Sequence, residues 1–277
     1  MRHPGWSPAG VWTSVGGTVR TALPPTLIVV GLLAAWELAA QWDVLADALN
    51  IEPFLIPAPS EIAEALWEDR ELLVDNGWVT LQEVLAGFGV SVMLGAAFAV
   101  LLHLSDALRR SFYPLLVASQ TVPIIVVAPI LVVWFGFGIA PKLAIIALIC
   151  FFPITVNTLD GLRSVDADAI RMMRTLDAGR WQLFKRLEAP SALPYFFSGA
   201  KIAVAVAVIG AVFGEWAGSS SGLGHLMQSA SAQLLTARVF AAVVILSVFA
   251  MALFGLLSLL ERRIAWWGPR AGQGMTR

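Results

Sequence analysis

Charged residues are scarce in this sequence. Lysine, arginine, aspartate and glutamate make up 13% of the 277 residues and hydrophobic residues 58%, whereas a soluble domain is about 25% charged and about 45–50% apolar. The formal net charge is -1 and the mean hydropathy is +0.78. This composition argues against a disordered or nucleic-acid-binding chain and indicates that a lipid bilayer is the main solvent.

Cysteine and histidine are nearly absent. The single cysteine, Cys150, lies in the apolar run AIIALICFFPI, so no internal disulfide and no cysteine-based metal site can form. The histidines His3, His103 and His225 show no i, i+4 pairing. No Gly-Lys pair occurs, so the phosphate-binding G-x-x-x-x-G-K-[ST] motif is missing. We therefore expect neither a metal nor a cofactor here, and expect any ATP hydrolysis to occur on another chain.

Six apolar runs are long enough to cross a bilayer, which takes about 20 residues. They cover approximately residues 24–42, 79–103, 112–135, 141–162, 193–215 and 238–260. The first run is too long for the core of a signal peptide and lacks a small-residue cleavage site, so we expect a retained membrane helix. The sequence thus predicts an all-α, polytopic membrane protein with six transmembrane helices.

Most lysines and arginines fall on one side of these spans. They cluster before the first span, in the loops after the second and fourth spans, and after the sixth. The positive-inside rule places this side, and with it both termini, in the cytoplasm. The predicted organisation is a cytoplasmic N-terminal segment 1–23, a transmembrane domain 24–265 and a cytoplasmic tail 266–277.

The loop after the first span, residues 43–78, is acidic. Its segment PAPSEIAEALWE carries a helix-start signal, Ser60 followed by Glu64, with Ile62 and Leu66 available for an apolar face. This helix is either a solvated surface element beside the bilayer or a docking surface for an external partner.

Proline is frequent in the third and fourth spans, at Pro114, Pro123, Pro129, Pro141 and Pro153. Proline kinks a membrane helix and frees a carbonyl, which is tolerated beside other helices or a water-filled cavity. We therefore expect these spans to line a cavity. The candidates for the solute path are the polar and aromatic residues near the kinks and at the end of the fifth span: Gln120, Thr121, Phe152, Thr155, Asn157, Glu215 and Trp216. In GSSSGLG, Gly218, Gly222 and Gly224 are expected to let the backbone turn tightly beside the mouth.

The loop between the fourth and fifth spans carries a charged helical pattern. In DAGRWQLFKRLEAPSALP, Leu183 and Leu187 follow Leu176 at helical spacing. Pro190 and Pro194 are expected to end this helix and begin the next span. From the residues alone two interpretations stay open: a basic helix that rests in anionic lipid headgroups, and a helix that fits a groove on a cytoplasmic partner.

The surrounding stretch MRTLDAGRWQLFKRLEAPSALPYFFSGAKIA resembles the cytoplasmic "EAA" loop in the membrane subunits of ATP-binding-cassette (ABC) importers. Arg171, Met172 and Met173 stand at the E-A-A positions and Asp177 stands at the glycine, and all four depart from the pattern. The downstream part matches it at Ala178, Trp181, Phe184, Pro190, Ala192, Leu193, Pro194, Gly199 and Ala200.

Three further stretches resemble one branch of this family, which carries nitrate, sulfonates, taurine, thiamine-precursor pyrimidines or riboflavin. They are SQTVPIIVVAPILVVWFGFGIAPK, CFFPITVNTLDGLRSVD and GAVFGEWAGSSSGLGHLM. The resemblance covers about residues 55–265.

The resemblance implies a type I ABC importer permease fold in the bacterial inner membrane, with a cytoplasmic coupling helix in the loop 163–190. It implies a homodimer, two ATPase subunits that bind ATP and magnesium, and an extracytoplasmic solute-binding protein. The residues implied in coupling to the ATPase are Leu176, Asp177, Ala178, Arg180, Trp181, Phe184 and Leu187. Of these, Trp181, Phe184 and Leu187 are expected to form the buried face of the helix.

The solute is expected to be neutral and flat. Lys201 is the only cation that the sequence places at membrane depth in spans two to six, which favours a thiamine-precursor pyrimidine or riboflavin over the alternatives, an aliphatic sulfonate, taurine or nitrate. A passive channel is a remote alternative, because the charged loop would then have no purpose. An intramembrane enzyme is another, and its candidate residues are Glu37, Glu83, Asn157, Lys201 and Glu215, which supply no evident nucleophile and base pair.

Overall fold

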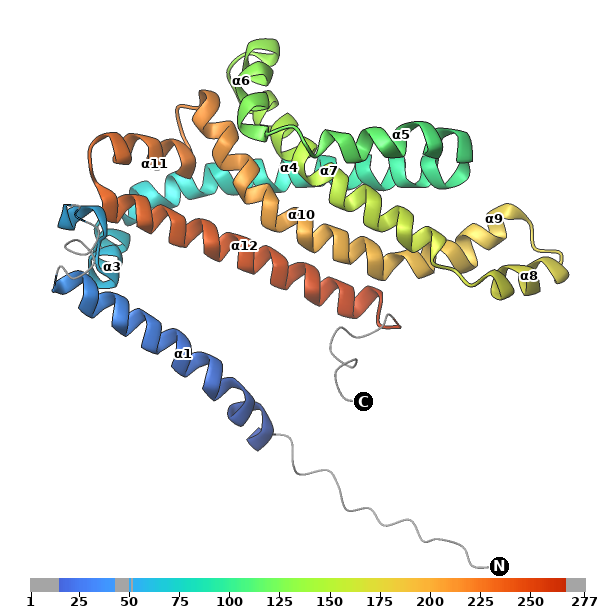
Figure 1. The fold of residues 1–277 in the computed structure, drawn as a ribbon, viewed down its shortest axis with the longest axis horizontal. Helices are drawn as coiled ribbons and strands as arrows, with labels where there is room; N and C mark the ends of the chain where they lie inside the picture. The colour runs from blue at the N-terminus through green and yellow to red at the C-terminus, as the bar shows by residue number, and fades with distance from the viewer. Residues whose placement is uncertain (1–14, 43–49, 51, 268–277) are drawn as a thin grey trace, which may run out of the picture. The chain divides into compact units, whose positions relative to one another are not determined.

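The computed structural model describes residues 15–42, 50 and 52–267, and every regular element in these ranges is helical (Figure 1). The chain divides into two compact units, residues 1–68 and 69–277. The first unit contains α1 (Val15–Gln41), the 3-10 helix η1 (Pro53–Leu55) and α3 (Pro59–Glu68). The second contains α4 (Arg70–Leu104), α5 (Asp106–Ser119), α6 (Ile124–Phe135), α7 (Ile139–Arg163), α8 (Ala167–Thr175), α9 (Arg180–Leu183), the π-helical turn η2 (Phe184–Glu188), α10 (Ala189–Gly218), α11 (Leu223–Ala232) and α12 (Thr236–Ile264). The predicted terminal segments lie largely outside the described residues.

In the first unit, α3 begins within one residue of the predicted helix start. Glu61, in its first turn, accepts a hydrogen bond from the backbone N–H of Ala58 at 3.0 Å. Glu37 of α1 accepts from both the N–H and the hydroxyl of Ser60, at 3.0 and 2.7 Å. The side chain of Ile62 is buried, as its place on the apolar face predicted. Ser60 therefore links α3 to α1 in addition to marking the helix start.

Four helices of the described chain are long and apolar enough to cross a membrane. They are α4, α7, the continuous helix Arg180–Gly218 and α12, and they contain the predicted second, fourth, fifth and sixth spans. The described apolar part of α1, Leu27–Gln41, is a shorter helix. The full number of six spans stays a prediction.

The predicted third span, 112–135, is not one straight helix. It consists of α5 and α6, which meet at a bend of 104°. Pro123 is the N-cap of α6 and has an extended ψ of 121°, and a proline also disfavours helical geometry at the residue before it. The prolines of this span, with Gln120 and Thr121 beside Pro123, predicted a kink, but hydropathy alone does not give the size of the bend.

The core of the second unit is α7, which packs between α4 and α10 (Figure 1). Small residues allow the close approach. A Cβ atom added to Gly87 of α4 would lie 2.6 Å from Cβ of Ile146, and one added to Gly199 of α10 would lie 2.5 Å from the carbonyl oxygen of Pro153. Helices in a membrane associate mainly through van der Waals contacts, because lipid is as apolar as their side chains and gives no hydrophobic driving force. Small residues allow these close backbone contacts.

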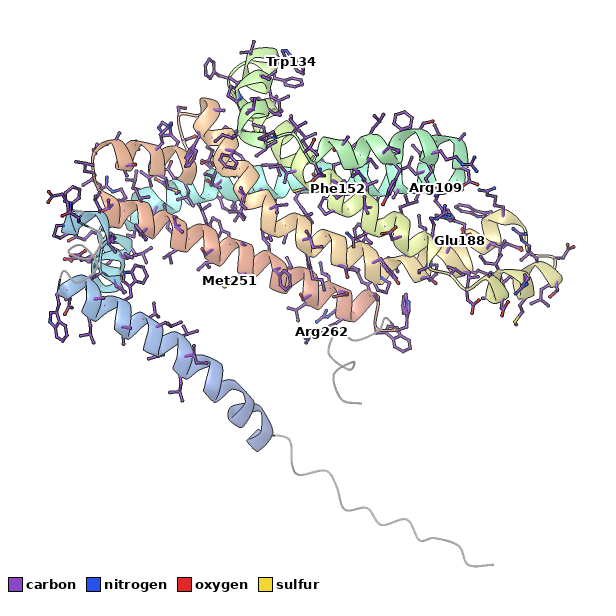
Figure 2. All side chains as sticks on the ribbon, in the orientation of Figure 1. Arg109, Trp134, Phe152, Glu188, Met251 and Arg262 are labelled. Atoms are coloured by element: carbon purple, nitrogen blue, oxygen red, sulfur yellow. The ribbon has the colours of Figure 1, made fainter. Side chains whose placement is uncertain are left out.

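Many large apolar side chains face away from this core. Trp134 of α6 and Met251 of α12, both labelled in Figure 2, are 73% and 64% exposed. In contrast, Phe152 of α7 packs against a buried cluster formed by Ala99, Leu102, Leu116 and Leu159. An apolar surface over a well-packed interior is the pattern expected of a chain surrounded by lipid.

We predict that Gly199→Ala lowers the stability of the chain by about 1–3 kcal/mol, as overpacking does elsewhere, because the new methyl group meets the backbone of α7. The measurement is the thermal unfolding midpoint in detergent. Gly89→Ala is the matched control, since a Cβ atom there has nothing within 4 Å. Equal midpoints for the two variants would show that the α7–α10 contact is not tight.

Candidate functional site

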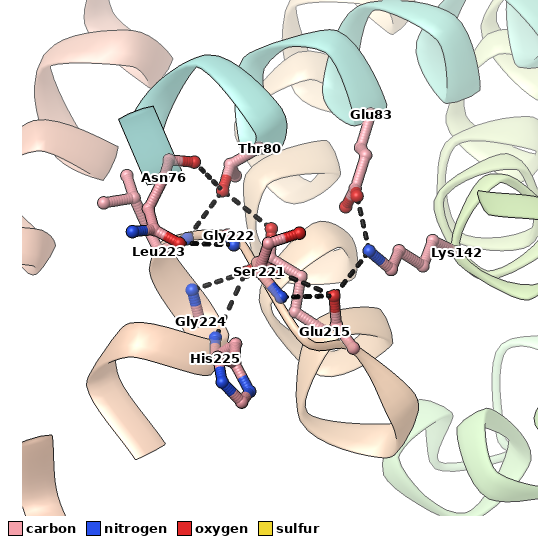
Figure 3. A network of polar contacts seen from close by, with 11 residues as sticks. Asn76, Thr80, Glu83, Lys142, Glu215, Ser221, Gly222, Leu223, Gly224 and His225 are labelled. Atoms are coloured by element: carbon pink, nitrogen blue, oxygen red, sulfur yellow. Dashed lines mark hydrogen bonds and ion pairs between the residues drawn. The ribbon is translucent and has the colours of Figure 1, made fainter. Parts of the chain in front are cut away.

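Two parts of the second unit, at its opposite ends, are candidates for function. The first is the α11 cluster, which consists of Asn76, Thr80, Glu83, Lys142 and Glu215, labelled in Figure 3, together with Ser219, which bonds to Lys142. The second is the coupling segment, residues 164–188, between α7 and α10. The α11 cluster lies near α11, and the coupling segment lies at the other end of α10 (Figure 1).

In the α11 cluster, Glu215 caps the N-terminus of α11. Its Oε2 accepts from the backbone N–H groups of Gly224 and His225, at 2.5 and 3.3 Å, and its Oε1 accepts from the Thr80 hydroxyl at 2.7 Å. The first N–H groups of a helix have no partner within the helix and carry partial positive charge, so a carboxylate is stabilised there. Glu215 is fully buried, and these donors replace the water that it has lost.

The turn before α11 requires glycine. Gly222 has φ = +106°, and a side chain there would collide with the Glu215 carboxylate. Its N–H donates to Asn76 Oδ1 at 2.8 Å, and the next N–H, of Leu223, donates to Thr80 Oγ1 at 2.8 Å. The expected tight turn in GSSSGLG is therefore confirmed at Gly222, and α4 provides two of the groups that hold it.

Lys142 joins α7 to this arrangement. Its Nζ lies 2.5 Å from Glu83 Oε1 and 2.6 Å from Ser219 Oγ, and both charged side chains are almost completely buried. Ser219 Oγ in turn donates to the carbonyl of Ser221 at 2.6 Å. Among the described residues, Glu83 Oε2 is buried without a hydrogen-bond partner. The ion pair thus ties α4, α7 and the turn before α11 together.

Sequence reasoning missed this ion pair, because it took Lys201 as the only cation at membrane depth in spans two to six. The position of the two residues along their spans could have indicated the pair. Glu83 is one turn inside the second apolar run and Lys142 is at the start of the fourth, so both lie near the same end of the predicted spans. Glu83 and Glu215, two candidates of the enzyme hypothesis, do come close together here. Both are buried: Glu215 contacts Thr80 and the N-terminus of α11, and Glu83 contacts Lys142.

The coupling segment differs from the single helix that the pattern in DAGRWQLFKRLEAPSALP predicted. Helix α8 ends at Thr175, and a new helix begins at Arg180 and continues to Gly218, 39 residues in all. Pro190 and Pro194 do not end it. The π-helical turn Phe184–Glu188 ends two residues before Pro190. The hydrogen bond from Ala189 N–H to the Phe184 carbonyl rearranges the helix just before the position where proline has no N–H to donate.

Asp177 adopts a left-handed conformation, with φ = +59°. The N–H of Ala178 donates to the Met173 carbonyl at 3.1 Å, and the N–H of Asp177 donates to the Arg174 carbonyl at 3.0 Å. These two bonds define a Schellman motif, whose left-handed position is usually glycine. Asp177 therefore keeps the backbone conformation that glycine in the family pattern favours, and aspartate is one of the few other residues that visit this region.

Of the three residues expected on the buried face of the coupling segment, Trp181 is not covered by this chain itself. Trp181 is 70% exposed and stacks on Phe184 with ring centroids 5.6 Å apart. Phe184 and Leu187 are half-buried, and the buried side chain is Leu183. On and after α8, Met172 and Leu176 are 66% and 69% exposed. The segment thus presents apolar side chains that the chain itself leaves uncovered.

The seven residues predicted for the solute path lie in three places. Gln120 and Thr121 are exposed at the α5–α6 bend. Phe152, Thr155 and Asn157 lie along α7, where Thr155 donates to the Gly95 carbonyl at 3.3 Å and Asn157 to the Pro153 carbonyl at 2.8 Å. Glu215 and Trp216 lie at the far end of α10, where Trp216 donates to the Gly224 carbonyl at 2.8 Å. Their role in a solute path stays a prediction.

Comparison with known proteins agrees with this architecture. Residues 91–266 match the family described as "Binding-protein-dependent transport system inner membrane component". The chain is 39% identical over 247 residues to the formylaminopyrimidine transport permease protein ThiX of Halalkalibacterium halodurans, covering 89% of this chain and 96% of that protein. It is 33% identical over 258 residues to the riboflavin transport system permease protein RibX of Chloroflexus aurantiacus, covering 92% and 91%.

A solved structure shows the same fold. The match is an inward-facing structure of the MetNI methionine ABC transporter, with a TM-score of 0.63, 19% identity, and coverage of 71% of this chain and 98% of that chain. The chain belongs to the family of binding-protein-dependent transport system inner membrane components, and it is the permease subunit of an ABC importer. The predicted type I importer permease fold is confirmed.

We predict that Lys142→Met destabilises the chain by about 3–5 kcal/mol, the usual cost of leaving one member of a buried ion pair alone. The double variant Lys142→Met/Glu83→Gln removes both charges and should recover most of this loss. Thermal unfolding of the single and double variants in detergent measures the difference. A double variant as unstable as the single one would show that the ion pair does not bind α4 to α7.

Proposed function

We propose that this permease imports a neutral, flat heterocycle, of the class of formylaminopyrimidine or riboflavin. The observation that carries the proposal is the pairing of charge. The two lysines within the predicted spans, 141–162 and 193–215, are both neutralised by acids: Lys142 lies 2.5 Å from Glu83, and Lys201 lies 2.7 Å from Glu261. Neither lysine is left to balance a sulfonate, taurine or nitrate. Relatives that carry pyrimidine and riboflavin transport names, at 39% and 33% identity, support the same class.

The chain is proposed to work as a homodimer with two ATPase subunits and an extracytoplasmic solute-binding protein. ATP and magnesium would bind to the ATPase, and this chain would hold no cofactor. The coupling segment and both termini would face the cytoplasm, in keeping with the concentration of basic residues on that side. The permease itself would catalyse no bond chemistry.

Docking of the ATPase is proposed to take place on α8 and the turn that follows it. Met172, Leu176 and Trp181 are exposed apolar side chains next to a loop rich in arginine. An apolar helix surface with a polar rim suits insertion into a groove of a partner. Because the helix from Arg180 runs unbroken to Gly218, force applied at this end would reach the α11 cluster. Alternating access would follow from closure of the ATPases.

We predict that Met172→Glu/Leu176→Glu abolishes capture of the cognate ATPase in a pull-down from detergent. Two apolar anchors replaced by charge should cost about 2 kcal/mol or more, which is about thirtyfold in affinity. Arg262→Glu, an exposed charge reversal on α12, is the control and should leave capture unchanged. Full capture by the double variant would contradict docking at α8.

The solute class is tested by uptake into proteoliposomes that contain the permease, its ATPase and its binding protein. With a panel of formylaminopyrimidine, riboflavin, taurine and an alkanesulfonate, we expect ATP-dependent uptake of one of the two heterocycles only. Uptake of taurine or the sulfonate would contradict the proposed solute class. Uptake without ATP would instead indicate a passive channel.

A further inference from the structure

Two polar contacts join the start of the long helix Arg180–Gly218 to the end of α4. Nε2 of His103, in the last turn of α4, lies 2.9 Å from Oε2 of Glu188, and the two side chains are only 13% and 16% exposed. The guanidinium of Arg180 donates to the carbonyl of Leu104 at 3.0 Å. Leu104 is the last residue of α4, so its carbonyl has no partner within that helix. Both contacts cross between helices.

The π-helical turn sits between these contacts. It covers Phe184–Glu188, after Arg180 and ending at Glu188, a residue labelled in Figure 2. A π turn accommodates one more residue than an α turn, and one residue turns a helix by about 100°. Without this turn, Arg180 and Glu188 would be directed to different sides of the helix from those observed. The turn therefore lets both residues reach the end of α4 at once.

The same two helices are also joined at their other ends. Thr80 of α4 donates to Glu215 of α10 at 2.7 Å. An acidic residue of the long helix thus contacts α4 at each end, Glu188 with His103 and Glu215 with Thr80. Between these points α7 packs against both helices at glycines that leave no room for a side chain. Such interdigitated packing resists sliding.

We propose that the His103–Glu188 pair, together with Arg180 and the Leu104 carbonyl, is a strut that makes α4 move with the coupling segment. This inference rests on the proposed docking of the ATPase at α8. His103 and Glu188 are positioning residues: they contact neither the ATPase nor the solute, and they determine which membrane helices follow the coupling segment. Without the strut, a displacement of the segment bends the long helix at the π turn and leaves α4 in place.

The test uses the complete importer, permease with ATPase and binding protein, in proteoliposomes. His103→Ala and Glu188→Ala should each lower solute-stimulated ATPase activity and solute uptake by about fivefold or more, the lower end of typical coupling between sites. The double variant should be no worse than either single one, because the two residues act through one contact. His103→Gln keeps a donor for Glu188 and should restore most of the activity.

Lys201→Met is the matched control. Lys201 pairs with Glu261 across α10 and α12 at 2.7 Å and is of similar burial, so its loss should lower the unfolding midpoint in detergent about as much, without uncoupling the importer. If His103→Ala and Glu188→Ala retain stimulation, if their effects add in the double variant, or if Lys201→Met uncouples equally, the strut is overturned. Should an alanine variant not fold, Glu188→Gln combined with His103→Phe keeps the volume, removes the contact, and must uncouple.

Pull-down of the ATPase separates this proposal from the one on which it rests. The strut variants should capture the ATPase as well as the unaltered permease does, because α8 is unchanged. Normal capture with lost stimulation supports the strut. Failure of the unaltered permease to capture its ATPase would instead contradict the proposed function.

Discussion

A polar group inside the lipid-embedded part of this chain has to find its partner within the protein, because hydrocarbon provides none. The α11 cluster shows how far this requirement reaches. Burial of Glu215 is compensated by two helix N–H groups and a threonine hydroxyl, and those donors come from α11 and α4. One buried carboxylate therefore determines where α11 begins, which side of α4 faces it, and why Gly222 carries no side chain.

The same requirement explains the other buried charges. Lys142 meets Glu83, and Lys201 meets Glu261, in each case across two helices. An unpaired charge in the bilayer costs several kcal/mol, by an estimate of about 2.5–3.5 kcal/mol from insertion measurements. Each pair consequently restricts the register of its helices, and each one also removes a cation that could have held an anionic solute. The ion pairs that hold the helices together are therefore also the basis of the proposed solute class.

The spans could be predicted from the sequence because hydrophobic length is a local property. The prediction 141–162 falls within α7, Ile139–Arg163, and 238–260 within α12, Thr236–Ile264. What was missed depends on geometry between residues. Pro123 marks the place of the α5–α6 bend but not its angle of 104°, and Lys142 is adjacent to Glu83 only after α7 has packed against α4. The π turn that carries the helix past Pro190 likewise has no signature in hydropathy.

The coupling segment shows a different limit of sequence-based prediction, because residue type alone did not show that Asp177 keeps the backbone conformation of the family's glycine. Asp177 departs from the family pattern by residue type, yet its φ of +59° and the two bonds of the Schellman motif show that the backbone is the one that glycine favours. A left-handed residue other than glycine costs about 1–2 kcal/mol, and aspartate keeps that cost low.

This conformation reverses the chain between α8 and the helix that starts at Arg180, so that Met172 and Leu176 stay exposed while Arg180 reaches the end of α4. The exposed apolar surface at Met172 and Leu176 and the proposed strut at Arg180 therefore both depend on the turn at Asp177. Helices α4, α7 and the long helix interlock at glycines, and the proposed strut joins α4 to the segment that follows α8. The α5–α6 bend, where Gln120 and Thr121 are exposed, lies outside these three helices.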